Sequence, residues 1–218
     1  MPRRSKRSSA LPTSAWCARH KGSCVADELR RGFKSDAERT AELVRGDLAL
    51  GPLDRLDCFA LAEAWGIPVV SLGELREDGA SEASIRRLMS PDAGFSATTV
   101  LVGPRRLIVY NPRNEAGRKA SSLAHELAHV ILEHEAAPAI GVGGCRHWDG
   151  RQEAEADWLG SALLVPRAGA LAWMLERDDI DSGASNFGVS LELFRWRVHH
   201  TGVLRQVQKL RRRAGAAP

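Results

Sequence analysis

Two histidines four residues apart constrain the fold of this chain more than any other feature of its sequence. Residues 125–129 read His-Glu-Leu-Ala-His. Apolar residues recur around them at intervals of three and four, which indicates a helix with one core-facing side: Leu123, Leu127, Val130 and Ile131. A helix turns by about 100° per residue, so His125 and His129 lie on one face about one turn apart. Because two neutral imidazoles at that separation can hold one tetrahedral zinc ion, the pair predicts a metal site on this helix.

Glu126, next to the first histidine, falls beside the predicted metal rather than on it. A carboxylate in that place can take a proton from zinc-bound water. The alternative is that the two histidines form a polar stripe on the surface of an amphipathic helix and bind no metal. The segments around the motif decide between these two interpretations.

A second, acidic helical segment begins at residue 153 and offers a third ligand. Glu153 and Asp157 are four residues apart and share a face, whereas Glu155 points elsewhere. A carboxylate from this helix would complete a set of two histidines and one glutamate with an open fourth position, as in catalytic zinc sites. Glu153 is the preferred ligand, and Glu155 replaces it if the helix register differs. Asp157 is placed to hydrogen-bond an imidazole N–H and to hold its tautomer. Without the histidine motif, the same residues would be a solvated first turn favoured by the helix dipole.

A third histidine of the metzincin type is excluded. That class needs a glycine three residues after the second histidine and a further histidine three beyond it, where this chain has Leu132 and Glu135. His134 lies five residues after His129 and therefore far round the helix wheel. We expect it to be a solvated histidine at the end of the helix.

The segment before the motif predicts a β-hairpin. Two β-branched runs, Thr98–Val102 and Leu107–Tyr110, flank a turn that begins with Gly103. Asn114 is a candidate N-cap for the histidine helix. Residues 67–71 predict a short strand, which Pro68 places at a sheet edge.

Other patterns predict helices over 36–48, 53–65, 82–89, 171–176, 190–198 and from 203 onward, a polar loop over 178–185, and a long loop over 136–149 that could act as a lid or substrate rim. Together these elements predict an α+β fold. It would be mostly helical, with a small antiparallel or mixed sheet packed against the helix that carries His-Glu-x-x-His.

With both motifs in view, the chain resembles the ImmA/IrrE family of zinc metallopeptidases, whose ligand arrangement is thermolysin-like. The resemblance covers roughly residues 38–204. The segments that carry it are Ile108–Asn111, Arg118-Lys119, Ala124–His129, Glu153–Pro166 and Phe187–Ser190. Three departures bear on substrate fit rather than on chemistry: Ala128 in place of Gly, Trp158 in place of Phe, and Ser121-Ser122 in place of Phe-Thr.

The resemblance implies that His125, His129 and Glu153 bind one Zn²⁺ and that Glu126 is the catalytic base. It implies a regulatory endopeptidase whose partner is a helix-turn-helix transcriptional repressor of the XRE type, cleaved or inactivated to release stress-response or mobile-element genes. A rival hypothesis is a non-catalytic, metal-binding regulator that sequesters such a repressor. A second rival is a regulator that binds DNA through basic ends.

No residue can be assigned from the sequence as the group that stabilises the oxyanion. Tyr110, the only tyrosine, ends the strand before the histidine helix. Arg146 and His147 lie in the long loop. All three are kept as candidates.

Charge divides the chain into three parts. Residues 1–34 carry nine basic and two acidic residues, and residues 195–218 carry seven basic residues and no acidic ones, although the whole chain has a net charge of only +4. We therefore predict a basic, disordered segment over 1–34, a metallopeptidase domain over 35–200, and a basic helix and tail over 201–218. The basic ends either attract nucleic acid or, as we favour, form solubilising tails.

Neither a membrane nor an oxidising compartment is indicated. No stretch approaches the roughly twenty apolar residues that span a bilayer, and the basic N-terminus lacks an apolar signal core, which predicts a cytoplasmic protein without a membrane partner. Four cysteines do not form a disulfide framework in a chain of 218 residues. Cys17, His20 and Cys24 lack a convincing fourth metal ligand. Cys58 is expected to be buried, and Cys145 lies in the long loop.

Overall fold

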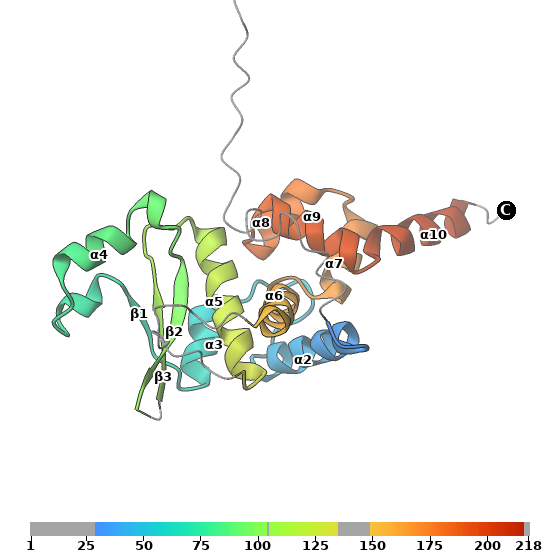
Figure 1. Ribbon diagram of the computed structural model, residues 1–218. Coiled ribbons are helices and arrows are strands. Elements are labelled where there is room, and N and C mark those ends of the chain that lie inside the picture. The colour runs from blue at the N-terminus through green and yellow to red at the C-terminus, as the bar shows by residue number, and fades with distance from the viewer. Residues whose placement is uncertain (1–28, 104, 135–148, 216–218) are drawn as a thin grey trace, which may run out of the picture.

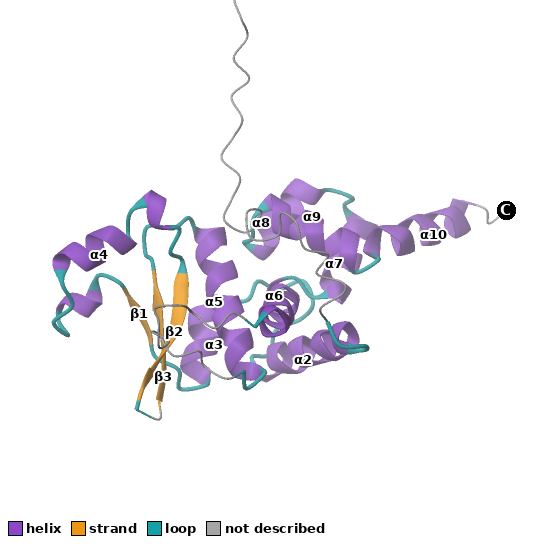
Figure 2. Ribbon diagram, in the orientation of Figure 1, coloured by secondary structure: helices purple, strands orange, loops and turns teal. Residues whose placement is uncertain are grey.

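The computed structural model of the chain describes residues 29–103, 105–134 and 149–215. These residues form a mainly helical α+β fold with one three-stranded sheet, as predicted (Figure 2). The α-helices are α2 (Phe33–Asp47), α3 (Cys58–Ala64), α4 (Glu82–Leu88), α5 (Ala116–Ile131), α6 (Gly150–Leu164), α7 (Arg167–Glu176), α8 (Ile180–Phe187), α9 (Leu191–His200) and α10 (Val203–Gly215). Two short 3₁₀ turns are η1 (Glu74–Arg76) and η2 (Pro91–Ala93).

The sheet is mixed and has the strand order β1-β3-β2. β2 (Ala97–Val102) and β3 (Arg105–Tyr110) form the predicted antiparallel hairpin, and Gly103 opens the turn with a φ of 60°, which glycine adopts readily. β1 (Val69–Ser71) runs parallel to β3 and lies at the edge, as Pro68 indicated. β2 forms the other edge of the sheet.

Helix α5 packs against the sheet on one side and against α6 on the other (Figure 1). Ile108 of β3 and Leu123 and Leu127 of α5 are almost fully buried in the same core. Where α6 crosses α5, a β-carbon on Gly160 would lie 3.0 Å from the backbone of Ala124 and His125. Glycine thus lets α6 approach α5 closely beside the first histidine of the motif.

Helix α2 covers another face of α6 and closes the core there. Phe33, Ala37, Ala41 and Val44 of α2 are buried in the same cluster as the apolar face of α6. The guanidinium of Arg197, fully buried on α9, donates to Glu38 of α2 at 2.5 Å and to the main-chain oxygen of Val165 at 2.9 Å. The buried Arg197 thus links α9 to α2 through an ion pair and to the end of α6 through a hydrogen bond.

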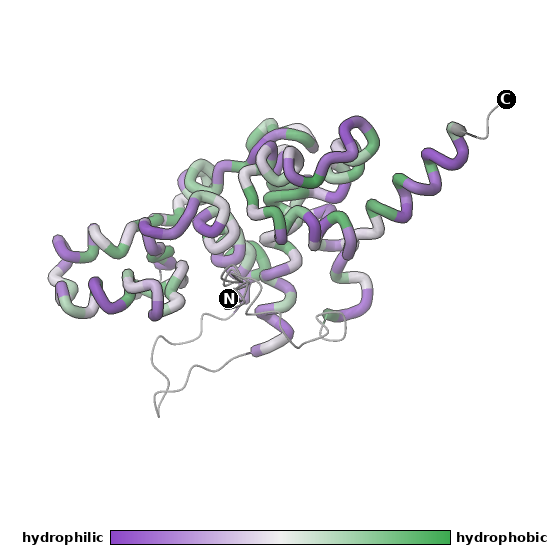
Figure 3. The backbone as a smooth tube through the Cα atoms, turned by 90° about the horizontal axis from the view of Figure 1, so that it is seen from above, coloured by the Kyte–Doolittle hydropathy of each residue, from purple (hydrophilic) through white to green (hydrophobic). Residues whose placement is uncertain are grey.

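Helix α10 extends away from this body and alternates between hydrophilic and hydrophobic stretches (Figure 3). Val203 and Val207 are buried, and Arg211 pairs with Asp178 and donates to the main-chain oxygen of Met174. The helix predicted from residue 203 onward is thus confirmed. Among the described residues, no single helix is long and apolar enough to cross a membrane; only α6 and α7 together, across a 47° bend, meet that length and composition.

Three local predictions were wrong, and in the first two a side-chain cap sets the residue at which the helix begins. The predicted 53–65 helix starts only at Cys58, because the Asp57 side chain accepts from the N–H of Phe59 and caps it. The predicted polar loop over 178–185 is mostly helix α8, whose first N–H groups are capped by Asp179. Helix α5 has Glu115, not Asn114, at its N-cap, with no side-chain hydrogen bond there.

Two further predictions, for Cys58 and Ser190, are confirmed. Cys58 is buried, and burial raises the pKa of its thiol to about 12. Ser190 caps α9 by accepting from the N–H of Leu193. Cys17, His20 and Cys24, which we did not expect to bind metal, lie outside the described residues, and so does the part of the predicted long loop from 136 to 148, which includes Cys145, Arg146 and His147.

Candidate metal centre

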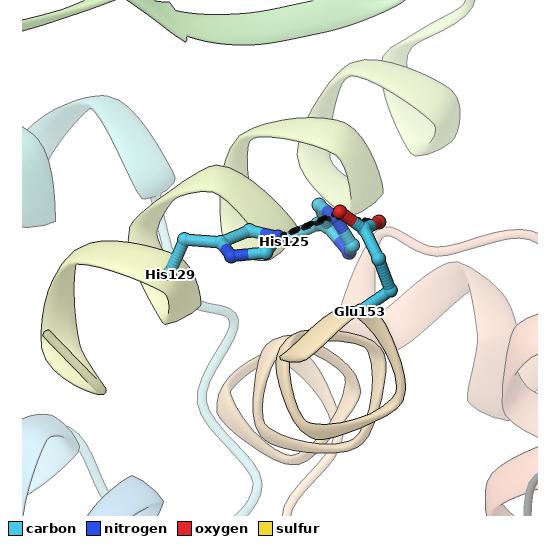
Figure 4. Close-up of side chains that lie close together, drawn as sticks. All are labelled: His125, His129 and Glu153. Atoms are coloured by element: carbon cyan, nitrogen blue, oxygen red, sulfur yellow. Dashed lines mark hydrogen bonds and ion pairs between the residues drawn. The ribbon is translucent and has the colours of Figure 1, made fainter. Parts of the chain in front are cut away.

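Three side chains from α5 and α6 converge on one point (Figure 4). His125 and His129 project from one face of α5, one turn apart, and their Nε2 atoms are 3.0 Å apart. Glu153 reaches them from the first turn of α6, with one carboxylate oxygen 3.4 Å from Nε2 of His125 and the other 3.7 Å from Nε2 of His129. Asp149 starts α6 at this place, because its side chain accepts from the N–H groups of Arg151 and Gln152.

The separations between these donor atoms fit a tetrahedral metal ion. Nitrogen and oxygen ligands about 2.0–2.1 Å from zinc would lie roughly 3.3 Å from one another at the corners of a tetrahedron. The two Nε2 atoms are 3.0 Å apart, Oε2 of Glu153 lies 3.4 Å from Nε2 of His125, and Oε1 of Glu153 lies 3.7 Å from Nε2 of His129, so these contacts lie on both sides of that value. Two imidazoles and one carboxylate are also the donor set of a catalytic zinc site rather than of a purely structural one. His125, His129 and Glu153 could therefore hold a metal ion.

Asp157 lies behind the first histidine, where the sequence placed it. Its carboxylate is 2.8 Å from Nδ1 of His125, on the side of the ring away from the converging Nε2 atoms. An acceptor there keeps the proton of His125 on Nδ1 and leaves Nε2 as the donor of an electron pair.

The charges around the histidines shift their pKa values in opposite directions. Burial alone would lower the pKa of His125, but its hydrogen bonds to Asp157 and Glu153 raise it to about 10. Burial and the neighbouring His125 lower the pKa of His129 to about 4. Burial would raise the pKa of Glu153, but the hydrogen bond to His125 and the imidazole charges bring it below its ordinary value. At neutral pH the metal-free pair therefore holds one extra proton, on His125.

Zinc uptake should displace that proton. A raised pKa means that the proton competes with the metal at any pH below that pKa, so apparent zinc affinity should rise about tenfold per pH unit between about pH 7 and 9. His129 contributes no proton in this range because its pKa is already low. Calorimetric titration with zinc, in two buffers of different ionisation enthalpy, measures the number released. We expect about one proton per ion; release of none would contradict the charge assigned to His125.

Glu126 faces the edge of the sheet rather than solvent. Its Oε2 accepts from the N–H of Thr99 at 2.8 Å and from the hydroxyl of Thr99 at 2.7 Å. One carboxylate oxygen of Glu126 is therefore held by β2, and the carboxylate lies close enough to His125 to act on its charge. The motif predicted Glu126, but nothing in the local sequence pointed to Thr99.

His134 is not the solvated histidine that the sequence predicted. Only 7% of its side chain is exposed, and its Nδ1 lies 2.9 Å from Nδ1 of His129. On the other side of the ring, Nε2 lies 3.3 Å from Glu155. The helix wheel failed here because α5 ends at Ile131 and the chain turns back before residue 134.

Glu155, the alternative third ligand, points away from the two histidines of the motif. Its buried carboxylate faces His134 and, at 3.9 Å, Arg151, while Glu153 faces the paired Nε2 atoms. The register of α6 thus turns Glu153, and not Glu155, toward the two histidines.

Of the three candidates for oxyanion stabilisation, Tyr110 alone lies within the described residues. The ring of Tyr110 packs edge-on against Phe59, and within the described residues its hydroxyl makes no hydrogen bond to the site. Arg146 and His147 lie outside the described residues.

A comparison with protein families agrees with this geometry. A family model described as the IrrE N-terminal-like domain, a peptidase family, matches residues 81–199. That range contains the sheet strands β2 and β3, both histidines, and all of α6. Comparison with curated proteins gave no match.

Proposed function

Because the chain belongs to the peptidase family with the IrrE N-terminal-like domain, we propose that it is a zinc-dependent endopeptidase. The observation that carries the proposal is the approach of Glu153 to the paired Nε2 atoms of His125 and His129, with Glu126 held beside them. A non-catalytic metal scaffold would have no use for a carboxylate fixed next to the metal ligands.

The chain's own groups divide the work of peptide hydrolysis. Zinc, when bound, supplies Lewis-acid chemistry, lowering the pKa of water and polarising a peptide carbonyl. In the proposed reaction, Glu126 accepts a proton from the attacking water and returns it to the leaving amine nitrogen. Asp157 keeps the proton of His125 on Nδ1, and Thr99 holds one oxygen of Glu126 so that the carboxylate cannot turn away.

Within the described part of the chain, β2 pairs with β3 alone, and its other edge offers a place for an extended substrate. Thr99 turns its N–H away from β3 toward Glu126, and in an antiparallel strand the same orientation recurs two residues on, at Leu101. Leu101 and Val102 are 51% and 58% exposed. A peptide that pairs with this edge would be held by its main chain, without demanding one sequence, beside the candidate base.

We propose that the substrate is a helix-turn-helix repressor of the XRE type, encoded near the gene for this protein. The zinc-loaded protein should cut such a repressor at one or a few bonds, which mass spectrometry of the fragments would identify. A chelator should stop the cleavage, and added zinc should restore it. If the zinc-loaded protein binds the repressor but leaves it intact, the sequestering alternative is correct instead. DNA binding that survives removal of residues 1–34 and 201–218 would favour the nucleic-acid alternative.

Thr99→Val tests how the base is held. Valine keeps the size of the side chain and the main-chain N–H but removes the hydroxyl donor, so Glu126 loses one of its two hydrogen bonds. A hydrogen bond to a charged group is worth about 1.5–3 kcal/mol, which corresponds to a fall in kcat of about tenfold or more with little change in KM. Steady-state kinetics measures both, and Thr99→Ser, which keeps a hydroxyl, is the matched control. Equal kcat in Thr99→Val and the wild type would show that the hydroxyl has no part in holding the base.

A further inference from the structure

The end of α5 brings His134 back against the second histidine of the motif. The N–H of His134 donates to the main-chain oxygen of His129, and the N–H of Glu133 donates to that of Val130. Glu133 has a φ of 54°, in the left-handed region. These three features define a Schellman motif, in which the residue after the left-handed one contacts the residue five positions earlier. That contact is frequently apolar, whereas here it joins two imidazoles.

Only one arrangement of protons satisfies the chain of contacts that follows. If Nε2 of His129 offers its electron pair to a metal, the ring proton must be on Nδ1. Nδ1 of His129 then donates to Nδ1 of His134, 2.9 Å away, so the proton of His134 must be on Nε2. That nitrogen lies 3.3 Å from the carboxylate of Glu155, which accepts.

The surroundings hold this chain of contacts in place. The side chains of His134 and Glu155 are 7% and 10% exposed, so water offers little competition for their hydrogen bonds. Arg106 of β3 donates to the main-chain oxygen of His134 at 3.2 Å and ties the turn to the sheet. Each candidate ligand histidine thus has its own partner at Nδ1, Asp157 for His125 and His134 for His129.

We propose that His134, backed by Glu155, is a positioning residue that fixes the tautomer and ring orientation of His129 and thereby sets the affinity of the centre for its metal. The proposal rests on the metal site of the proposed function, and it adds residues that the motif does not contain. It predicts that loss of the acceptor at residue 134 weakens metal binding without removing a ligand.

The test compares zinc affinities of the full chain, measured by competition with a chromophoric chelator. His134→Phe keeps a ring in the turn but removes the acceptor, and we expect affinity to fall roughly 10- to 100-fold. His134→Asn should restore most of it, because Oδ1 of asparagine lies about where Nδ1 of histidine lies and accepts a hydrogen bond. His199→Phe, at an exposed position on α9, is the matched control and should bind zinc as the wild type does. The visible absorption bands of the cobalt-loaded protein should change in His134→Phe and recover in His134→Asn.

The outcomes are distinct. Wild-type zinc affinity in His134→Phe would overturn the proposal. If metal-free His134→Phe does not fold, Glu155→Leu and Glu155→Gln provide the test. Weaker zinc binding in Glu155→Leu, with affinity near that of the wild type in Glu155→Gln, supports the proposal. Wild-type zinc affinity in both variants overturns it. If the wild type binds zinc but cleaves no repressor, the proposed function fails while this comparison still decides the role of His134. A wild-type chain that binds no zinc would overturn both.

Discussion

Glu126→Gln should bind zinc as tightly as the wild type and hydrolyse its substrate on the order of 1,000-fold more slowly. Glutamine cannot accept the proton that the carboxylate takes from water. Its amide oxygen can still accept from the N–H and hydroxyl of Thr99, so the side chain should keep its position. The loss would therefore report the missing base rather than a displaced one.

Mass spectrometry of the fragments over time measures the rate of hydrolysis, and the zinc content per chain measures metal binding. Glu192→Gln removes an exposed carboxylate at the start of α9 and should change neither quantity. A Glu126→Gln protein that cleaves at the wild-type rate would show that another group accepts the proton.

His129→Ala should leave the purified protein essentially without metal. One of three converging donors is lost, and His134 would face an empty space instead of an imidazole. We expect zinc affinity to fall by on the order of 1,000-fold or more and cleavage to disappear with it. His199→Ala, which removes an exposed imidazole from α9, is the matched control.

The carboxylate ligand is tested in the same way by a pair of variants on α6. Glu153→Gln should release the metal, while Glu155→Gln should keep it, because only Glu153 faces the paired Nε2 atoms. One zinc ion per chain in His129→Ala would refute the proposed ligand set. So would loss of the metal in Glu155→Gln together with its retention in Glu153→Gln.

The sequence predicts the part of this centre that depends on local spacing. Four-residue intervals in a helix place His125 above His129, and Glu153 above Asp157, whatever the rest of the fold does. The β-branched runs and Gly103 likewise predict the hairpin, because strand and turn preferences act over a few residues.

Contacts that depend on backbone turns or on distant segments could not be predicted. His134 reaches His129 only because Glu133 adopts a left-handed conformation, which glycine or asparagine would have signalled and glutamate does not. Thr99 meets Glu126 across the packing of β2 on α5, 27 residues away in the chain.

The position of α2 decides how this protein can be shortened for study. The family match spans residues 81–199 and leaves out α2, yet α6, which carries Glu153 and Asp157, is buried against that helix on the side facing away from α5. A polypeptide trimmed to the matched range would expose the apolar flank of α6 to water. It would also leave the buried Arg197 guanidinium without its partner, the carboxylate of Glu38. A shortened polypeptide should therefore begin no later than residue 29, so that α6, which carries Glu153, still packs against both α5 and α2.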